Sequence, residues 1–416
     1  MASRKDFLTQ VAAGGAASLL STLTPIKELF TEQMGASILP GQLPTRKDYS
    51  LSDSVTYLNH GSTGTMPKIV QEARRSYLAL CENNPWFYMW SSEWEEPIHE
   101  VREKVARYIN ANPNEITFPH NTTEIFNLLA LGLRLGSGDE VLFPNLNHSG
   151  ASIPFHFHAS KKGYDVRVFE MPVERISDIN VDDLLALYDE HITPKTRLVV
   201  IPHIDNTFGV RQPAKEITKL ARSKGVPFVA LDTAQTMGMI PIDVKDLDVD
   251  IIGTSAHKWL QAPKGISVAY FNPRIWEEVS PMWVTWGQER WKGSSRVFED
   301  YGTRNRPEIL SIGHAIDFQA SLDEEVKSEK LQSLWNLAKD LADEHPNTTW
   351  RSPRTWELSG SLFVIEVNSI KPSELSNGLF LDHGIVFRPF DGYSTIRISP
   401  NLANTEEEIS RLFELI

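Results

Sequence analysis

The sequence has a single cysteine, Cys81, among its 416 residues. One thiol can form neither an internal disulfide nor a thiolate metal cluster, so we expect no bound metal. Basic residues are also few: the chain has 41 Lys and Arg residues and 54 Asp and Glu residues, which gives a net charge of −13. An acidic chain without a basic tract is a poor candidate for binding nucleic acid. These shortages favour an enzyme that handles small metabolites.

Long hydrophobic runs are missing as well. Residues 11–23 are mildly apolar but too short to form an ordinary transmembrane helix. They follow residues 3–8, SRKDFL, which resemble a twin-arginine export signal with Lys5 in place of the second arginine. Residues 1–36 therefore predict a signal-like segment and a periplasmic or extracytoplasmic location. No clear A-x-A cleavage site follows, and the alternative is an amphipathic N-terminal helix of a cytoplasmic protein.

Residues 68–305 show short apolar runs that alternate with helical patterns. The runs are bounded by Pro, Gly, Asn or Asp and lie at 116–118, 140–143, 166–169, 198–202, 228–231, 251–252 and 266–271. Such runs are typical of strands buried on both faces. Helical patterns at 97–110, 124–133 and 213–224 separate them. The alternation predicts an α/β domain with a mainly parallel sheet and helices on both sides.

The pattern changes after residue 306. One long helical stretch at 308–344 leads to apolar runs at 361–367, 384–389 and 395–399, and a closing helix is expected from residue 405. This order predicts a smaller α+β domain over residues 306–416. Residues 37–67 carry few helix signals, and we expect them to cross to that smaller domain.

Lys258 stands in the segment TSAHKWLQAPKG, residues 254–265. Because this segment lies between two predicted strands, it is expected to be a loop at a strand end, where open α/β sheets bind their ligands. A single lysine is more often an ordinary solvated side chain. The other segments of the chain argue against that alternative here.

Asp232 follows the apolar run 228–231. A carboxylate at the end of a buried strand is costly to desolvate without a cationic partner, and a protonated pyridine nitrogen is such a partner. The alternative is an aspartate that caps the next helix.

Thr122 and Thr123 open a predicted helix after the residues FPHN. Hydroxyls and free backbone N–H groups at a helix start form an anion site suited to phosphate. The alternative is an ordinary threonine cap followed by Glu124.

Together these segments resemble the class V aminotransferases, a branch of the fold type I enzymes that use pyridoxal 5'-phosphate (PLP), and most of all the isopenicillin-N-epimerase-like group. The resemblance runs from about Tyr57 to the C-terminus. Six motifs carry it in the family's order, namely YLNHG at 57–61, NTT at 121–123, DTA at 232–234, the lysine loop SAHKWL with PKG at 255–265, GTR at 302–304 and IRIS at 396–399.

The resemblance implies a role for each matched position. Lys258 would hold PLP as a Schiff base and later carry the α-proton, with its pKa lowered by the cationic cofactor. Asp232 would pair with the pyridine nitrogen, and Gln235 and Asn206 would lie near the ring oxygen. His148 would stack on the pyridine face. The phosphate would be bound by Thr122, Thr123, Ser255 and His257.

The resemblance also implies a dimer and a substrate. Thr303 matches a residue that reaches the phosphate of the neighbouring subunit, so we expect a homodimer with shared active sites. Arg397 would bind the α-carboxylate of a small amino acid or peptide, and Asn59, His60 and Gly61 would face the same substrate. Two aromatic stretches could shape the pocket or the dimer seam, namely Trp86, Phe87, Tyr88, Trp90 and Trp94, and Trp283, Trp286 and Trp291.

Several reactions fit this residue set. Transamination needs only Lys258 and is our first expectation. Epimerisation needs a second acid, for which His60 or a nearby tyrosine is a candidate. A lyase or modifying enzyme of an exported peptide or siderophore is a further alternative, by analogy alone. Cysteine desulfuration is rejected because no cysteine follows Cys81. A non-catalytic binding protein is disfavoured because Lys258, Asp232 and Arg397 are all present.

Overall fold

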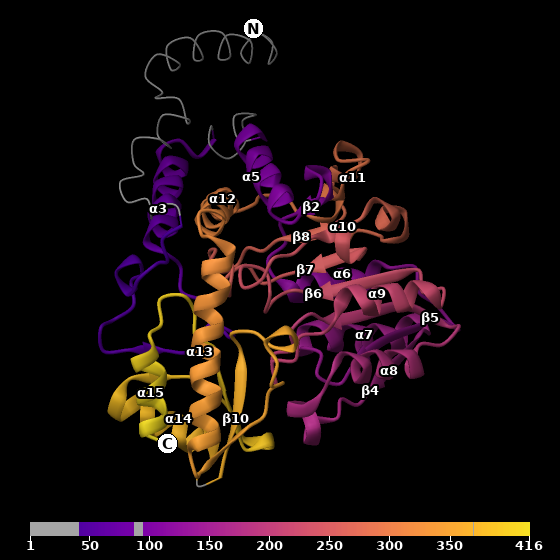
Figure 1. Ribbon diagram of the computed structural model, residues 1–416. Coiled ribbons are helices and arrows are strands. Elements are labelled where there is room, and N and C mark those ends of the chain that lie inside the picture. Colours follow the sequence, from indigo (N-terminus) through magenta and orange to yellow (C-terminus); the bar gives the residue numbers. More distant parts are fainter. Residues whose placement is uncertain (1–40, 87–94, 369) are drawn as a thin grey trace, which may run out of the picture. The chain divides into compact units, whose positions relative to one another are not determined.

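The structure is a computed structural model that describes residues 41–86, 95–368 and 370–416 (Figure 1). The signal-like segment, residues 1–36, lies outside the described residues. So do four members of the first aromatic stretch, namely Phe87, Tyr88, Trp90 and Trp94. Among the described residues, no helix has the length and apolar character needed to cross a membrane.

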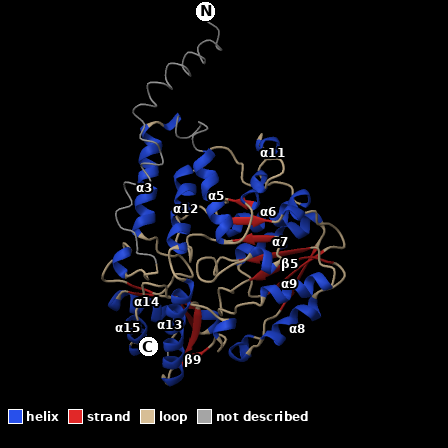
Figure 2. Ribbon diagram, turned by 45° about the horizontal axis from the view of Figure 1, so that its top comes forward, coloured by secondary structure: helices blue, strands red, loops and turns tan. Residues whose placement is uncertain are grey.

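A seven-stranded sheet forms the centre of the larger domain (Figure 2). Its strand order is β2-β8-β7-β6-β5-β3-β4, and every pairing is parallel except those of β8 with β2 and β7. The strands are β2 (Ile116–Thr117), β3 (Glu140–Pro144), β4 (Asp165–Phe169), β5 (Thr196–Pro202), β6 (Phe228–Asp232), β7 (Ile251–Gly253) and β8 (Ala269–Phe271). The predicted mainly parallel α/β sheet is therefore confirmed.

Helices flank this sheet. Two pairs pack against each other, α6 with α7 and α8 with α9. These helices are α6 (Thr122–Gly132), α7 (Ser149–Lys162), α8 (Val181–His191) and α9 (Ala214–Ser223). Short helices α10 (Val244–Leu247) and α11 (Gly287–Arg290) lie further along the chain.

One strand differs from its expectation. The run 166–169 was predicted to be buried on both faces, but β4 has exposed side chains at Asp165, Arg167 and Val168. The prediction was wrong there: β4 is an edge strand that pairs only with β3, and its side chains are mostly exposed, whereas those of the opposite edge strand, β2, are buried. A short apolar run does not reveal whether its strand is central or at an edge.

The long helical stretch predicted at 308–344 is two helices, α12 (Arg306–Ala320) and α13 (Glu324–Glu344). The break occurs because the Asp323 carboxylate accepts hydrogen bonds from the N–H groups of Glu325 and Val326, both at 3.0 Å, which starts a new helix. Helix α12 packs against α3 (Lys68–Asn83) and α5 (Glu95–Tyr108), as Figure 1 shows. An ion pair of 2.6 Å between Arg74 and Glu308 joins α12 to α3.

The C-terminal part holds a four-stranded antiparallel sheet in the order β12-β13-β10-β9. Its elements are β9 (Thr348–Trp350), β10 (Phe363–Val367), α14 (Pro372–His383), β11 (Ile385–Val386), β12 (Arg388–Phe390), β13 (Thr395–Ile398) and α15 (Glu406–Glu414). Trp335 of α13 packs edge-on against Trp350, and Trp350 stacks on Phe363. Neither β9 nor α14 was among the predicted elements.

The segment before α3 is tied to the C-terminal elements. Strand β1 (Thr56–Tyr57) pairs in parallel with β11, and Asn59 forms a bridge with Ser399. Residues 59–65 are therefore held between the smaller sheet and the loop that carries Lys258, which the backbone hydrogen bond from Gly64 to His257 also shows.

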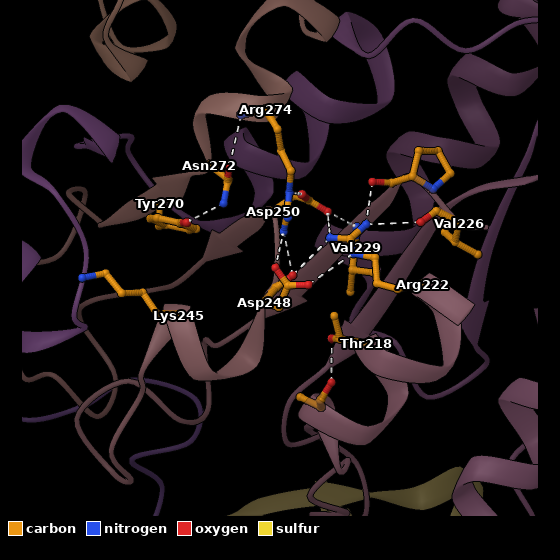
Figure 3. Close-up of polar contacts among 12 residues, drawn as sticks. Thr218, Arg222, Val226, Val229, Lys245, Asp248, Asp250, Tyr270, Asn272 and Arg274 are labelled. Carbon is orange, nitrogen blue, oxygen red and sulfur yellow. Dashed lines mark hydrogen bonds and ion pairs between the residues drawn. The ribbon is translucent and has the colours of Figure 1, made fainter. Parts of the chain in front are cut away.

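A buried ion cluster closes the amino end of the parallel sheet (Figure 3). Asp250, just before β7, is fully buried and accepts hydrogen bonds from the Val229 N–H and from Arg222, both at 2.6 Å, and from Arg274. Asp248 pairs with the same two arginines from a more exposed position. The cluster fastens α9 and the chain after β8 to the centre of the sheet.

Candidate active site

The lysine loop begins where β7 ends and returns to β8, as the sequence predicted. Lys258 is half-buried in it, and its backbone N–H donates to the Ser255 carbonyl at 3.0 Å. Gln261 takes a left-handed backbone conformation, with a φ of 60°. Its side chain donates to the Tyr49 hydroxyl and to the Thr65 carbonyl, at 3.2 and 3.0 Å. These bonds hold the end of the loop against the N-terminal segment.

Asp232 is the last residue of β6 and is buried at the carboxyl end of the sheet. Its Oδ1 accepts the Ala234 N–H at 2.9 Å, and in the described chain no donor reaches Oδ2. Burial raises the pKa of Asp232 to about 6, and it lowers the pKa of Lys258 to about 8 against the opposing attraction of Asp232. The alternative of a helix cap fails, because the next described helix, α10, begins only at Val244.

The start of α6 brings two predicted phosphate residues together. The Thr122 and Ser255 hydroxyls lie 2.7 Å apart, although they come from different loops. The cap of this helix is Asn121, whose side chain accepts the Glu124 N–H at 3.1 Å, and not a threonine. This leaves the Thr122 hydroxyl and the first N–H groups of an eleven-residue helix available for an anion.

Thr123 and His148 lie together at the starts of α6 and α7. A Cβ atom on Gly150 would come within 2.5 Å of the Thr123 hydroxyl, and His148 Nδ1 accepts the Gly150 N–H at 3.1 Å. Burial, followed by the charges of Lys258 and Arg397, lowers the pKa of His148 to about 4. His148 is therefore neutral, and it shares the electrostatic environment of Lys258.

Two glycines let the N-terminal loop pack closely, Gly64 against the lysine and Gly61 against Leu362. A Cβ atom on Gly64 would lie 1.9 Å from the Lys258 carbonyl oxygen, and the Gly64 N–H donates to the His257 carbonyl at 2.8 Å. A Cβ atom on Gly61 would meet a Leu362 methyl at 2.8 Å. Gly64 was not among the predicted site residues, because a glycine in a loop is common and nothing local indicates its approach to Lys258. The pKa of His257 itself is lowered to about 4 by burial and by Lys258.

Gln235 joins the same two loops. Its Nε2 donates to the Gly61 carbonyl at 2.9 Å, and its Oε1 accepts the Trp259 indole N–H at 2.8 Å. The resemblance placed Gln235 near the cofactor's ring oxygen. In the structure, these two bonds leave one amide hydrogen for such a contact.

His60 has a different position from the one expected. We expected it to face the substrate, but its ring is buried, with Nδ1 3.2 Å from the Ser399 carbonyl and Nε2 3.1 Å from the Thr65 hydroxyl. A carbonyl only accepts, so Nδ1 carries the proton and Nε2 accepts from Thr65. Burial lowers the pKa of His60 to about 4. His60 therefore fastens the loop and has no free nitrogen for substrate.

Arg397 extends from β13 into the space beside this loop. Its guanidinium donates to the Asn206 carbonyl at 2.8 Å, to Asn59 Oδ1 at 3.2 Å and to the Ser62 hydroxyl at 2.6 Å. Within the described chain it has no carboxylate partner at ion-pair distance, and its buried Nε has no acceptor. Burial and the charge of Arg388 lower its pKa to about 10. A desolvated guanidinium with free donors is suited to a carboxylate ligand.

Asn206 contacts Arg397 through its backbone carbonyl, and its predicted place near the cofactor's ring oxygen stays a prediction. The turn that presents its carbonyl is built by the neighbouring Asp205, whose buried carboxylate accepts the N–H groups of Thr207, Phe208 and Val210 at 2.7 to 2.8 Å. The negative charge of Asp205 also raises the pKa of Arg397 in opposition to burial. Asp205 was missed by the sequence analysis because aspartate in a turn is common.

The sequence matches a known protein family over most of its length. The family model Aminotransferase class-V matches residues 56–412. The chain belongs to the class V aminotransferase family.

Two curated relatives illustrate this membership. The isopenicillin N epimerase of Streptomyces clavuligerus is 29% identical over 385 residues, which cover 88% of this chain and 95% of the relative. A cysteine desulfurase of Salmonella newport is 28% identical over 394 residues, which cover 86% of this chain and 91% of the relative.

Solved structures agree on the fold. A C-DES mutant with glycine covalently linked to its PLP cofactor superposes with a TM-score of 0.80 at 23% identity, covering 89% of this chain and 98% of its own. The cysteine desulfurase CsdA of Escherichia coli superposes with a TM-score of 0.76 at 25% identity, covering 89% and 96%.

The described residues fit the cofactor of this class V family, and the chain is a PLP-dependent enzyme. Lys258 would hold it through its amine, and the free Oδ2 of Asp232 suits a cationic ring nitrogen. The hydroxyls of Thr122 and Ser255 at the start of α6 suit its phosphate. When bound, PLP withdraws electrons from the α-carbon of an amino acid.

Thr303 lies apart from these groups on an exposed loop, and its side chain forms no hydrogen bond within the described chain. The loop is nevertheless tied to the predicted phosphate site. Arg304 pairs with the buried Glu299 at 2.9 Å, and Glu299 accepts the Phe118 N–H at 2.7 Å, four residues before Thr122. The position is consistent with an action on a second subunit, which stays a prediction.

The remaining aromatic residues are divided. Trp86 and Trp286 are largely exposed, Trp283 is partly exposed, and the Trp291 ring lies under the Arg296 guanidinium at 3.2 Å.

No group of three or more His, Cys, Asp or Glu side chains among the described residues could hold a metal ion.

Proposed function

We propose that this class V enzyme is an aminotransferase that uses Lys258 as its single base at the α-carbon of an amino acid. The observation that carries the proposal is the lysine's environment. Burial lowers the pKa of Lys258 to about 8 between the carboxylate of Asp232 and the guanidinium of Arg397. A lysine with this pKa has a neutral fraction near physiological pH and can move a proton.

The substrate is proposed to enter with its α-carboxylate on Arg397. Asn59 and Ser62 hold the guanidinium from one side, and the Asn206 carbonyl holds it from another. The α-carbon would then lie between Arg397 and Lys258, the two cations that also lower the pKa of His148.

Epimerisation is the second candidate, and the 29% identity to an isopenicillin N epimerase supports it. It requires an acid on the face opposite Lys258. Both nitrogens of His60 are used in structural hydrogen bonds. The Tyr57 hydroxyl donates to the Thr63 carbonyl at 2.7 Å, and burial raises its pKa. These engaged groups favour single-base transamination.

Cysteine desulfuration does not suit this chain, although desulfurases are among its relatives. That reaction needs a nucleophilic cysteine on a loop after the lysine. The one cysteine, Cys81, lies in α3, and burial raises the pKa of its thiol to about 11. A thiol with this pKa is a poor nucleophile at neutral pH.

A half-reaction tests the proposal. The holoenzyme is mixed with single amino acids in the absence of an acceptor, and we expect one equivalent of 2-oxo acid per active site with a matching change in cofactor absorbance. Lys258→Ala is expected to release none, and Lys219→Ala, which changes an exposed lysine of α9, is expected to behave as wild type. Loss of optical activity without 2-oxo acid would instead establish an epimerase. If no free amino acid reacts, the substrate is a peptide or a larger acyl amino acid.

We also propose a homodimer and export. Thr303 supports the dimer, because its exposed hydroxyl is free to reach a second subunit. The twin-arginine-like residues 3–8 support export. Sedimentation of the holoenzyme and N-terminal sequencing of the protein from the native cell test the two proposals. A monomer with full activity, or an intact N-terminus in the cytoplasm, would contradict them.

A further inference from the structure

Arg388 is a second arginine beside the proposed carboxylate site. It lies on β12 directly opposite Arg397 of β13 in the antiparallel ladder, so the two side chains share one face of the sheet. Arg388 is exposed, and within the described chain no carboxylate lies at ion-pair distance from it.

The two arginines share an aromatic neighbour. The guanidinium carbons of Arg388 and Arg397 each lie 5.7 Å from the centroid of the Phe390 ring. The charge of Arg388 is also the largest electrostatic influence that lowers the pKa of Arg397. The buried Arg397 and the exposed Arg388 are therefore close neighbours, and both contact the apolar ring of Phe390.

Like charges directly opposite each other in a ladder destabilise a sheet. Asp205 offsets this repulsion only on the Arg397 side and without an ion pair. For Arg388 no described carboxylate does so, since the nearby Asp391 pairs with Lys371 at 3.2 Å and accepts the Ser373 N–H. A ligand with two anionic groups would relieve it.

We infer that the substrate is an amino acid whose side chain carries a second carboxylate, with Arg388 binding that distal group and Phe390 contacting the methylene chain. This inference rests on the proposed function, because it takes Arg397 as the site of the α-carboxylate. It makes Arg388 a residue that determines substrate specificity rather than one that takes part in the proton transfer.

Binding of unreactive analogues tests the inference. α-Methyl-L-glutamate and α-methyl-L-glutamine have no α-hydrogen and differ in the distal charge, so calorimetric titration of the holoenzyme measures recognition without turnover. We expect the glutamate analogue to bind at least about tenfold more tightly, as for a charge-assisted contact. In Arg388→Gln the preference is expected to fall to within about twofold, whereas Arg388→Lys should keep part of it.

Arg411→Gln is the matched control, because it removes one exposed arginine from α15 of the same domain. It changes the net charge equally and should keep the wild-type preference. Equal binding of both analogues by the wild type, or an unchanged preference in Arg388→Gln, overturns the inference. If the Arg388-dependent preference is found but no amino acid releases a 2-oxo acid, the proposed transamination fails and the specificity site stands.

Discussion

Two aspartates at strand ends, one at each end of the parallel sheet, are buried and are partnered in opposite ways. At the amino end, Asp250 has two arginines and the Val229 N–H around its carboxylate (Figure 3). At the carboxyl end, Asp232 has one N–H, from Ala234, and an oxygen that no described donor reaches.

This difference distinguishes a structural carboxylate from a functional one. A buried charge is tolerated when its own fold supplies enough donors, as for Asp250. The charged form of Asp232 is destabilised by its burial, and the rise of its pKa to about 6 reflects this cost. Lys258 offsets this cost in part, and the cation predicted to offset the rest is the ring nitrogen of the cofactor. The carboxyl end is therefore where binding and chemistry occur.

The largest effect is expected at the carboxyl end, for Lys258→Ala. Loss of the only base proposed at the α-carbon should lower kcat/KM by at least about 10⁴-fold, or roughly 5.5 kcal/mol. Denaturant unfolding of the cofactor-free variant should show a folded protein, because Lys258 has no ion-pair partner in the described chain. Retention of more than a hundredth of the activity would refute its role.

Asp250→Asn should lower the stability of the protein and leave its activity nearly unchanged, the reverse of Lys258→Ala. It leaves Arg222 and Arg274 beside a neutral group in a buried cluster, and we expect a loss of about 3 kcal/mol in the free energy of unfolding with kcat nearly unchanged. Asp248→Asn is the control, because Asp248 is more exposed and takes a left-handed φ of 51° that asparagine tolerates. Its cost should stay below about 1 kcal/mol. Equal losses in both variants would remove the distinction between them.

Asp232→Asn should stabilise the cofactor-free protein while it damages the enzyme. The folded pKa of about 6 lies above the ordinary value of 3.8. The stability that the protonated form contributes is therefore fully present below about pH 4 and is lost as the pH rises through about 6. We expect the variant to exceed the wild type by about 1–3 kcal/mol near pH 8 and to match it below about pH 4. Unfolding of the apo proteins across this range measures the difference, and a variant less stable near pH 8 would contradict the argument.

Thr303→Val should give the smallest effect. Loss of one hydroxyl contact to the cofactor phosphate of a second subunit should weaken PLP retention by about five- to tenfold, near 1 kcal/mol. Mixed dimers that pair a Thr303→Val subunit with a Lys258→Ala subunit show which subunit's cofactor phosphate Thr303 contacts. If Thr303 acts on the partner subunit, the Lys258-containing site of a mixed dimer regains wild-type affinity. If affinity stays low there, Thr303 acts within its own subunit.

Much of the fold follows from local pattern. The apolar runs and helix signals between residues 68 and 305 indicated the parallel sheet, and the runs at 361–367 and 395–399 indicated strands β10 and β13. Edge position was not predictable, as β4 shows, because it depends on which strand is a neighbour. The break between α12 and α13 depends on Asp323, which caps α13 but stands within a continuous helical pattern in the sequence.

The site was predictable where a residue type is rare in its setting. Asp232 ends an apolar strand, and Lys258 stands in a loop bounded by strands, so both were found. Arg388 and Gly64 were not found, because an arginine in a strand and a glycine in a loop are common locally. Their meaning arises from Arg397 across the ladder and from the Lys258 carbonyl.

The sequence by itself determined the family, the cofactor and the residues whose chemistry is unusual for their local setting, since these depend on side-chain type and order along the chain. Only the tertiary structure decided how those groups are used. His60 lost its expected substrate role because a carbonyl and a hydroxyl from other segments occupy both nitrogens. Asp232 and Asp250 are the same residue at strand ends, and their difference arises from donors far away in the sequence. Hydrogen bonding and desolvation depend on neighbours in space, which local pattern does not specify.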